Sequence, residues 1–229
     1  MNLVHRRDTF LSRPFLTVAT IMLFTTCLSA AEFSVTPGIG INLAGISVDN
    51  DDDALGRRVG FRGGADLSVA LTRWFGVRTG VIYSSKGAAW RYIRENDEGK
   101  SVDAVDISYA RYIDIPLAAQ VTFPQIGPVR PFVAAGVAGS VFLGAYKVVK
   151  IDGNEIFRGD KNEDVKNTDF SVVVSGGISY PIGPGNLILE GGYSFGVMDI
   201  NRNEEESVRN SVAMVTAGYR FSIKKKSDK

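Results

Sequence analysis

The chain has little of the chemistry on which most enzymes depend. Among its 229 residues there is one cysteine, Cys27, and one histidine, His5, and both stand close to the N-terminus. If that stretch is removed during export, no disulfide, no thiolate nucleophile and no imidazole remain. Catalysis by a Ser–His or Asp–His arrangement is then excluded, and we expect a protein that is not an enzyme.

Long apolar runs are also missing, since no segment after residue 30 has the roughly 18 apolar residues of a transmembrane helix. The shorter run Phe15–Phe24 follows three arginines and precedes small residues up to Ala31. This order is typical of a secretory signal peptide, whereas the alternative, a buried N-terminal helix, does not explain these flanks. We expect residues 1–30 to be a leader cleaved near Ala30 or Ala31, and 31–229 to be the mature domain.

Neither sign of charge dominates. Three arginines and one aspartate leave with the leader, so residues 31–229 carry 23 basic and 24 acidic side chains. Nucleic-acid-binding domains usually have a strong basic excess. The charge balance therefore argues against nucleic acid as a partner.

What the chain does have is a two-residue alternation of apolar and polar side chains, interrupted by turn residues. Successive side chains of a β-strand point to opposite faces, so this period predicts strands. We predict eight of them, at 33–47, 59–71, 75–86, 107–123, 129–146, 168–181, 187–198 and 208–223. The predicted fold is all-β, an eight-stranded antiparallel up-and-down β-barrel.

The predicted connections alternate between long and short. The short ones are 72–74, 124–128 and 182–186, and the long ones are 48–58, 87–106, 147–167 and 199–207. Bacterial outer-membrane barrels have short periplasmic turns and longer external loops. We therefore expect the long connections outside the cell and both termini in the periplasm.

Alternation alone does not decide which face is outside, because a soluble lipocalin-like barrel would hold its apolar residues in the interior. Here the polar positions are mostly glycine, alanine and serine with isolated charges, whereas water-exposed strands are usually rich in lysine, glutamate and threonine. Small residues suit the narrow lumen of an eight-stranded barrel, which side chains fill. The apolar positions are therefore expected to face lipid.

Aromatic residues on the apolar positions gather at both strand ends. Phe33, Phe75, Phe123, Tyr180 and Phe221 stand near the short connections, and Tyr83, Tyr109 and Phe195 near the long ones. Two aromatic belts that flank an aliphatic band are typical of a membrane-spanning barrel. We predict a transmembrane barrel of the outer membrane, in contact with its lipid and lipopolysaccharide.

Single charges on the polar positions should lie in the lumen. They are Asp66, Arg78, Asp114, Glu190 and Arg220. A charge inside a narrow barrel needs a partner, so we expect a paired network that plugs the lumen, with Asp66 next to Arg78 and Glu190 next to Arg220. A catalytic pair of carboxylates is the less favoured alternative.

The acidic stretch Asp49–Asp53 has some likeness to a calcium-binding loop. The glycine required at the sixth place is Ala54, and the glutamate required at the twelfth is Gly60. We interpret it as an acidic loop tip, with weak divalent binding beside lipopolysaccharide as the alternative. No cofactor is expected.

Three segments resemble the PorT-like outer-membrane β-barrel family, which shares its architecture with the OmpA-type barrels. They are 112–117 (YIDIPL), 131–136 (PFVAAG) and 189–194 (LEGGYS). The resemblance implies a barrel in the outer membrane and a role in envelope assembly or secretion.

The last predicted strand resembles the recognition signal of the barrel-assembly machinery. Thr216, Gly218, Phe221 and Ile223 follow its spacing, although Lys224–Lys229 extend beyond it. We therefore expect the barrel-assembly machinery as a partner.

The sequence leaves three functions open. The first is a non-enzymatic structural or interaction role through the external loops, with an unidentified envelope protein as partner. The second is a small pore or transport accessory, and the third is an envelope assembly or secretion factor. An eight-stranded barrel usually leaves no wide channel, which favours the first over the second.

Overall fold

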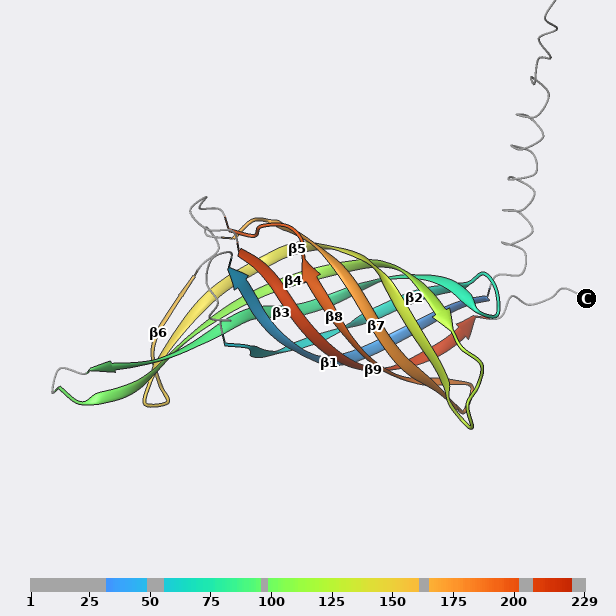
Figure 1. Ribbon diagram of the computed structural model, residues 1–229, viewed down its shortest axis with the longest axis horizontal. Coiled ribbons are helices and arrows are strands. Elements are labelled where there is room, and N and C mark those ends of the chain that lie inside the picture. The colour runs from blue at the N-terminus through green and yellow to red at the C-terminus, as the bar shows by residue number, and fades with distance from the viewer. Residues whose placement is uncertain (1–31, 49–55, 96–98, 161–164, 202–207, 224–229) are drawn as a thin grey trace, which may run out of the picture.

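Eight antiparallel strands close into a ring in the computed structural model, which describes residues 32–48, 56–95, 99–160, 165–201 and 208–223 (Figure 1). The strands are β1 (Glu32–Val48), β2 (Arg58–Ala70), β3 (Phe75–Glu95), β4 (Ser101–Thr122), β5 (Arg130–Ile151), β6 (Asn154–Asp160), β7 (Thr168–Ile182), β8 (Gly185–Gly196) and β9 (Val208–Ile223). The ring runs β1-β2-β3-β4-β5-β7-β8-β9, and β9 pairs again with β1. The predicted eight-stranded barrel is confirmed.

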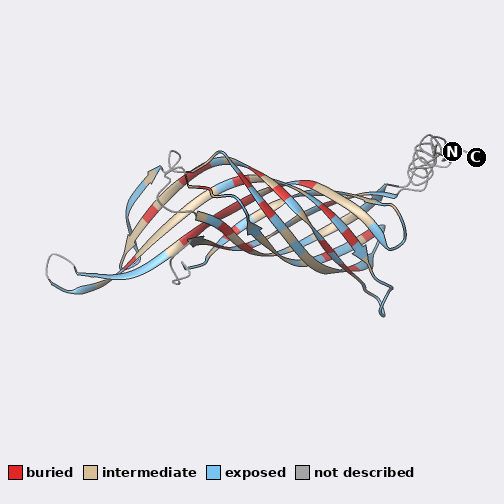
Figure 2. Ribbon diagram, turned by 45° about the horizontal axis from the view of Figure 1, so that its top comes forward, coloured by how far each residue is buried: buried red, intermediate tan, exposed pale blue. Residues whose placement is uncertain are grey.

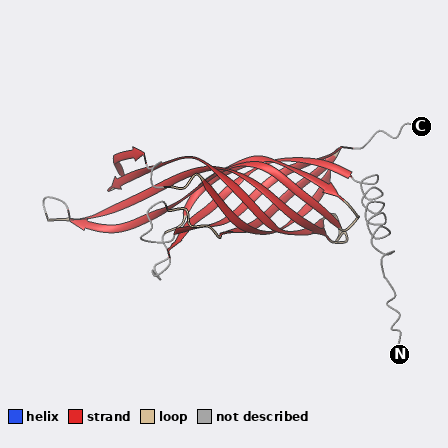
Figure 3. Cartoon of the chain, turned by 90° about the horizontal axis from the view of Figure 1, so that it is seen from above, coloured by secondary structure: helices blue, strands red, loops and turns tan. Residues whose placement is uncertain are grey.

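Closure leaves the ring without a free edge, because each of its strands pairs on both sides. β1, for example, pairs with β2 from Glu32↔Ala70 to Ala44↔Arg58, and with β9 from Phe33↔Ile223 to Val48↔Val208. The described residues form strands and no helix, so no helix there could cross a membrane (Figure 3).

The predicted alternation fixes which side of each strand faces outward. In β1 the odd positions Ile39, Ile41 and Leu43 are exposed, whereas Asn42 and Ala44 are buried. Buried and exposed positions alternate along the barrel in Figure 2. Large apolar side chains therefore cover the outside of the barrel, as expected for a surface in contact with lipid.

The predicted ends of three strands are wrong. β3 continues to Glu95 instead of ending at 86, β4 begins at Ser101 instead of 107, and β5 continues to Ile151 instead of 146. Much of the expected loops 87–106 and 147–167 is therefore strand, and β6 was not predicted at all. The charged residues in these ranges suggested loops. In the structure, backbone hydrogen bonds between β3, β4 and β5 keep the strands extended beyond the barrel.

These additions continue the sheet of the barrel beyond its rim, and we call this projecting part the extension sheet. It consists of 87–95 of β3, 101–110 of β4, 145–151 of β5 and the whole of β6. It projects from the end of the barrel opposite the short turns (Figures 1 and 3). The extension sheet is thus on the side of the long connections.

Two glycines mark the passage from barrel to extension sheet. Gly87 has φ 131° and Gly144 has φ 150°, conformations that side-chain-bearing residues rarely adopt. A Cβ on Gly87 would lie 2.1 Å from the carbonyl oxygen of Ser108 on β4. Beside Gly144 the β4–β5 register shifts by a bulge, which bends a strand pair and increases its twist. Glycine is therefore required where the paired strands change direction.

Some predictions fall outside the described residues. They are the leader at 1–30 with its cleavage site, the acidic stretch Asp49–Asp53, and Lys224–Lys229 after the last strand.

Candidate functional site

The lumen is crossed by an ion pair between opposite walls. Arg78 of β3 and Glu190 of β8 make two hydrogen bonds, one of them from Nη1 to Oε2 at 2.7 Å. Arg78 Nη2 also donates to Ser175 Oγ at 3.0 Å. Their side chains are only 11% and 16% exposed. A bidentate arginine–carboxylate pair with little exposure holds both side chains firmly across the barrel.

This pairing differs from the prediction, which placed Asp66 with Arg78 and Glu190 with Arg220. Among the described residues, neither of those pairs makes a salt bridge. Asp66 lies opposite Gly80 in the β2–β3 register, two positions along from Arg78. An eight-stranded barrel is narrow enough for a long side chain to reach the far wall, so Arg78 contacts Glu190 instead of its neighbour.

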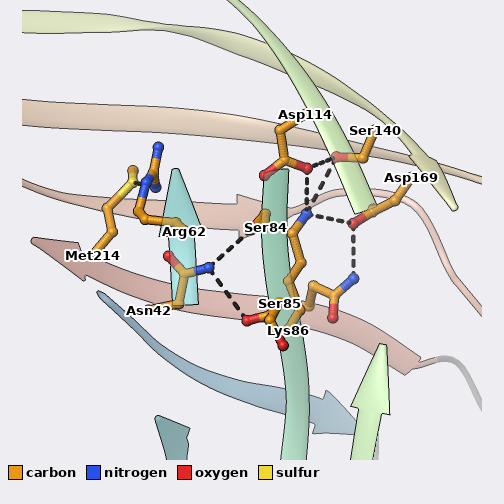
Figure 4. Close-up of polar contacts among 10 residues, drawn as sticks. Asn42, Arg62, Ser84, Ser85, Lys86, Asp114, Ser140, Asp169 and Met214 are labelled. Carbon is orange, nitrogen blue, oxygen red and sulfur yellow. Dashed lines mark hydrogen bonds and ion pairs between the residues drawn. The ribbon is translucent and has the colours of Figure 1, made fainter. Parts of the chain in front are cut away.

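A second cluster of charges lies nearer the extension sheet (Figure 4). Lys86 Nζ is 3.0 Å from Asp114 Oδ1 and 3.6 Å from Asp169 Oδ2. Ser140 Oγ donates to Asp114 Oδ1 at 2.6 Å, and Asn210 Nδ2 donates to Asp169 Oδ2 at 2.8 Å. The Lys86 side chain is 3% exposed and that of Asp169 is 0% exposed. One cation thus joins carboxylates from two strands inside the barrel.

Lys86 and Asp169 were missed by the sequence interpretation. Lys86 has the same parity as Arg78 on β3, so the alternation would have placed it in the lumen if the predicted strand had not ended there. Asp169 is the second residue of β7, where a charged side chain suggests a loop. The signal that could have placed Lys86 in the lumen is its even number, because the other even-numbered positions of the same predicted strand, such as Arg78, face inward.

Between the two clusters lies a small cavity of about 70 Å³. Arg62 of β2 lines it and contacts the sulfur of Met214 on β9, the strand on the other side of β1 (Figure 4). Asp66, Asp114 and Glu190 line it as well. In the described part of the chain, no group of three or more His, Cys, Asp or Glu side chains could hold a metal ion. Side chains thus fill the interior at two levels.

Six of the eight predicted belt residues are exposed in the structure. Phe33, Phe75, Phe123, Tyr180, Phe221 and Phe195 are exposed on the outside, and Tyr83 is half-buried beside Phe61. Tyr109 differs, because it lies in the extension sheet opposite Gly87, where Arg58 and Tyr146 cover its ring. Tyr109 therefore packs within the protein more than it faces lipid.

The four residues of the predicted assembly signal lie on β9, which closes the barrel against β1. Phe221 and Ile223 are exposed on the outside. Gly218 lies opposite Gly38, where an added Cβ would be 2.9 Å from the carbonyl oxygen of Pro37. The glycine permits a close approach of the two strands that complete the ring.

One face of the extension sheet carries exposed aromatic side chains. The register aligns Trp90, Asp106, Val149 and Phe157 in one row across its four strands. Residues directly opposite each other share a face, and Tyr92, two positions from Trp90, shares it too. Trp90 is 42% exposed and Phe157 is 55% exposed. The Lys147–Asp106 ion pair, at 2.5 Å, lies in the middle of this face.

The opposite face is held by stacked rings and guanidinium groups. Tyr109 and Tyr146 stack with centroids 4.4 Å apart and planes at 6°. Arg58 lies 3.8 Å from the Tyr109 centroid, and Arg158 lies 5.4 Å from that of Tyr146. A hydrogen bond with Arg158 lowers the pKa of Glu155 on the same strand. Cation–π contacts of this kind rigidify the base of the extension sheet.

The connection after β8 is anchored by Asp199. Lys166 Nζ is 2.8 Å from Asp199 Oδ2, and the amides of Asn201 and Val208 donate to Oδ1 at 3.0 and 2.9 Å. Burial raises the pKa of this carboxyl, but hydrogen bonds from Lys166 and the two amides outweigh it and lower the pKa to about 2. The Asp199 carboxylate therefore holds the two ends of the connection after β8 together and links them to Lys166, which lies just before β7.

This anchoring should be lost only in strong acid. The pKa of Asp199 falls from 3.8 to about 2 on folding, so its contribution is complete above about pH 4 and disappears as the pH falls through about 2. Hydrogen exchange of the Val208 amide should show constant protection from pH 7 to about 4 and a decline below that. In Asp199→Asn the amide should exchange several times faster at pH 7. Equal rates in both proteins would contradict the anchoring role.

A closed ring with an apolar outside and a charged, filled lumen defines a transmembrane β-barrel. The chain belongs to the outer membrane protein beta-barrel domain family, whose model matches residues 24–202. The protein is accordingly an outer-membrane protein, as predicted. No curated protein matches the chain.

Solved structures with a similar fold include those of three bacterial proteins. Neisserial surface protein A is 18% identical, with 85% of this chain and 99% of that chain covered and a TM-score of 0.47. Ail, the attachment invasion locus protein of Yersinia pestis, is 18% identical, with 83% and 99% covered and a TM-score of 0.36. OprG from Pseudomonas aeruginosa is 12% identical, with 84% and 96% covered and a TM-score of 0.43. At these identities the likeness concerns the fold alone.

Proposed function

We propose that the protein is a non-enzymatic outer-membrane barrel that binds a protein partner outside the cell through its extension sheet. The observation that carries this proposal is the exposed aromatic face of that sheet, formed by Trp90, Tyr92 and Phe157. Tryptophan, tyrosine and phenylalanine are enriched at protein interfaces and rare on surfaces that contact only water.

The extension sheet also offers backbone hydrogen bonds. Among the described residues, β6 pairs only with β5, and residues 90–95 of β3 pair only with β4, so each presents an edge without a backbone partner there. Such an edge can accept an added strand from another chain, with neighbouring side chains supplying specificity. Aromatic side chains and open edges on one projecting sheet are a combination suited to protein binding.

The filled lumen favours an interaction role over a pore. Arg78 and Glu190 join opposite walls at one level, and Lys86 joins Asp114 and Asp169 at another. Ions that crossed the barrel would have to separate buried ion pairs at both levels, at a cost of several kcal/mol each. These ion pairs therefore favour binding of a partner over conduction of ions through the barrel.

A single cysteine on the extension sheet tests both its orientation and its role. Arg94 is exposed and lies on the same face of β3 as Trp90 and Tyr92, and the only native cysteine, Cys27, lies in the expected leader. We expect Arg94→Cys on intact cells to react with a membrane-impermeant maleimide that carries a photo-crosslinker. Illumination should then give a discrete cross-linked product of higher mass.

Matched variants give this experiment its controls. Gln125→Cys, in a short turn, should not label on intact cells, and Met198→Cys, on the connection after β8, should label without giving the product. Adding Trp90→Ser to Arg94→Cys should abolish the product while labelling persists. Labelling at Gln125 but not at Arg94 would reverse the orientation, and a product unaffected by Trp90→Ser would refute the role of the aromatic face.

We further propose that the chain is a PorT-like member of its family and that the barrel-assembly machinery inserts it. The segments 112–117, 131–136 and 189–194 support the first, and Thr216, Gly218, Phe221 and Ile223 on the closing strand support the second. A role in envelope assembly or secretion is then the alternative to adhesion-like binding outside the cell. Defective secretion in a deletion strain that Trp90→Ser fully restores would favour this alternative.

A further inference from the structure

A large cavity opens at the end of the barrel that carries the short turns. Its volume is about 620 Å³, within the range of small-molecule sites. Residues of two short turns line it, among them Arg73 and Gln125, together with residues near the ends of the neighbouring strands, among them Asn186 of β8 and Ser222 of β9. The Arg78 side chain lies at its inner end, where the Arg78–Glu190 pair crosses the lumen. We call this cavity the vestibule.

The charge of the vestibule is strongly one-sided. Arg73, Arg78, Arg130 and Arg220 line it, whereas Glu32 is the one acidic residue of its lining in the part of the chain that the structure describes. Glu190 neutralises Arg78, but none of the other three arginines makes a salt bridge among the described residues. Three unpaired cations and one carboxylate leave two net positive charges around a space large enough for a ligand.

Buried side-chain atoms without hydrogen-bond partners lie in the wall of the vestibule. Arg220 Nε and Ser68 Oγ are buried atoms that make no hydrogen bond, and both residues line the vestibule. The side chain of Gln120 is also buried there: its Nε2 donates to Thr122 Oγ1 at 3.2 Å, and its Oε1 has no partner. A half-turn of that amide would present its NH₂ group instead, because amide oxygen and nitrogen are nearly alike in shape. Buried donors without partners are uncommon in native proteins and call for an explanation.

We propose that the vestibule binds a phosphate group from the periplasmic side, with Arg130 and Arg220 as its principal ligands. A phosphate monoester carries nearly two negative charges at pH 7, which match the two net positive charges of the site. The guanidinium fork donates two parallel hydrogen bonds to phosphate oxygens, and the Ser68 hydroxyl and Gln120 amide supply further donors. This site lies at the opposite end of the barrel from the extension sheet and does not depend on the function proposed for that sheet.

The test uses the protein purified from outer membranes in a neutral detergent. Titration calorimetry with pyrophosphate, a soluble probe, and with dihexanoyl phosphatidic acid, a lipid probe, distinguishes a periplasmic solute from a lipid headgroup as the natural source of the phosphate. We expect saturable binding of at least one probe, weakened about tenfold or more in Arg130→Gln and in Arg220→Gln, since each variant loses charged hydrogen bonds.

Controls separate the vestibule from general charge and from misfolding. Arg91→Gln removes the same charge from the extension sheet and should leave binding unchanged. Arg130 is exposed at the mouth, so Arg130→Gln should retain the altered gel migration of an unheated folded barrel even if Arg220→Gln does not. If neither probe binds to the wild-type protein, or if Arg130→Gln binds as tightly as wild type, the proposal is wrong.

Discussion

Replacing Glu190 with glutamine should destabilise the folded barrel by about 3–5 kcal/mol, because Arg78 would keep its charge inside the lumen without a carboxylate. Arg78→Gln should cost a similar amount for the converse reason. The side chains of Arg78 and Glu190 are largely buried and joined by two hydrogen bonds. Water therefore cannot replace the lost partner when one of the two charges is removed. Urea unfolding of the refolded barrel in lipid vesicles measures these differences.

The double change Arg78→Gln with Glu190→Gln should cost clearly less than the sum of the single changes. Removing both charges leaves no unpaired ion, and two glutamines can hydrogen-bond to each other. The exposed pair Glu155–Arg158 is the matched control, and Glu155→Gln should leave unfolding unchanged within error. Neutral and additive single changes at Arg78 and Glu190 would show that these side chains are surrounded by water, and the pore hypothesis would regain support.

The second large effect is expected at Lys86. Lys86→Met removes the cation that Asp114 and Asp169 share, and the fully buried Asp169 carboxylate would retain only its hydrogen bond from Asn210. The loss should exceed that of Glu190→Gln, because two carboxylates are left without a cation instead of one arginine without a carboxylate. Urea unfolding again measures it, and a failure of the variant to refold would be the extreme form of the same result.

Two comparisons make this expectation specific. Lys147→Met breaks the Lys147–Asp106 pair, whose lysine is about one third exposed, and should cost far less. Adding Asp114→Asn to Lys86→Met should recover part of the lost stability, but not all of it, since Asp169 keeps its charge. Equal losses for Lys86→Met and Lys147→Met would contradict a buried cluster.

The two clusters also show how the barrel achieves a single closed arrangement. Arg78 and Glu190 lie on β3 and β8, and Lys86 and Asp169 lie on β3 and β7, so each pair joins strands that are not neighbours in the ring. A slip of one residue in any register would turn these charges toward lipid. The interior ion pairs therefore penalise incorrect pairing far more than the apolar exterior does.

The sequence by itself determined the fold class and most of the barrel. Side-chain alternation has a period of two wherever one face of a strand meets lipid and the other meets a narrow lumen, so strands such as 208–223 were located with their correct ends. The same alternation assigned Asp66, Arg78, Asp114, Glu190 and Arg220 to the interior positions of the strands. It also identified outward aromatic residues such as Phe33, Phe75 and Phe221, because parity along a strand requires no knowledge of its neighbours, whereas Tyr109 packs against Arg58 and Tyr146.

Only the tertiary structure decided which side chains meet. Parity places Arg78 in the lumen, but its partner depends on the curvature of the closed ring, which brings Glu190 nearer than Asp66. Closure likewise gathers Arg73, Arg130 and Arg220 around one vestibule from distant parts of the chain. The extension sheet was hidden for a related reason: its strands are stabilised by pairing with one another, and neither lipid nor lumen imposes an alternation on residues 87–95 or 154–160.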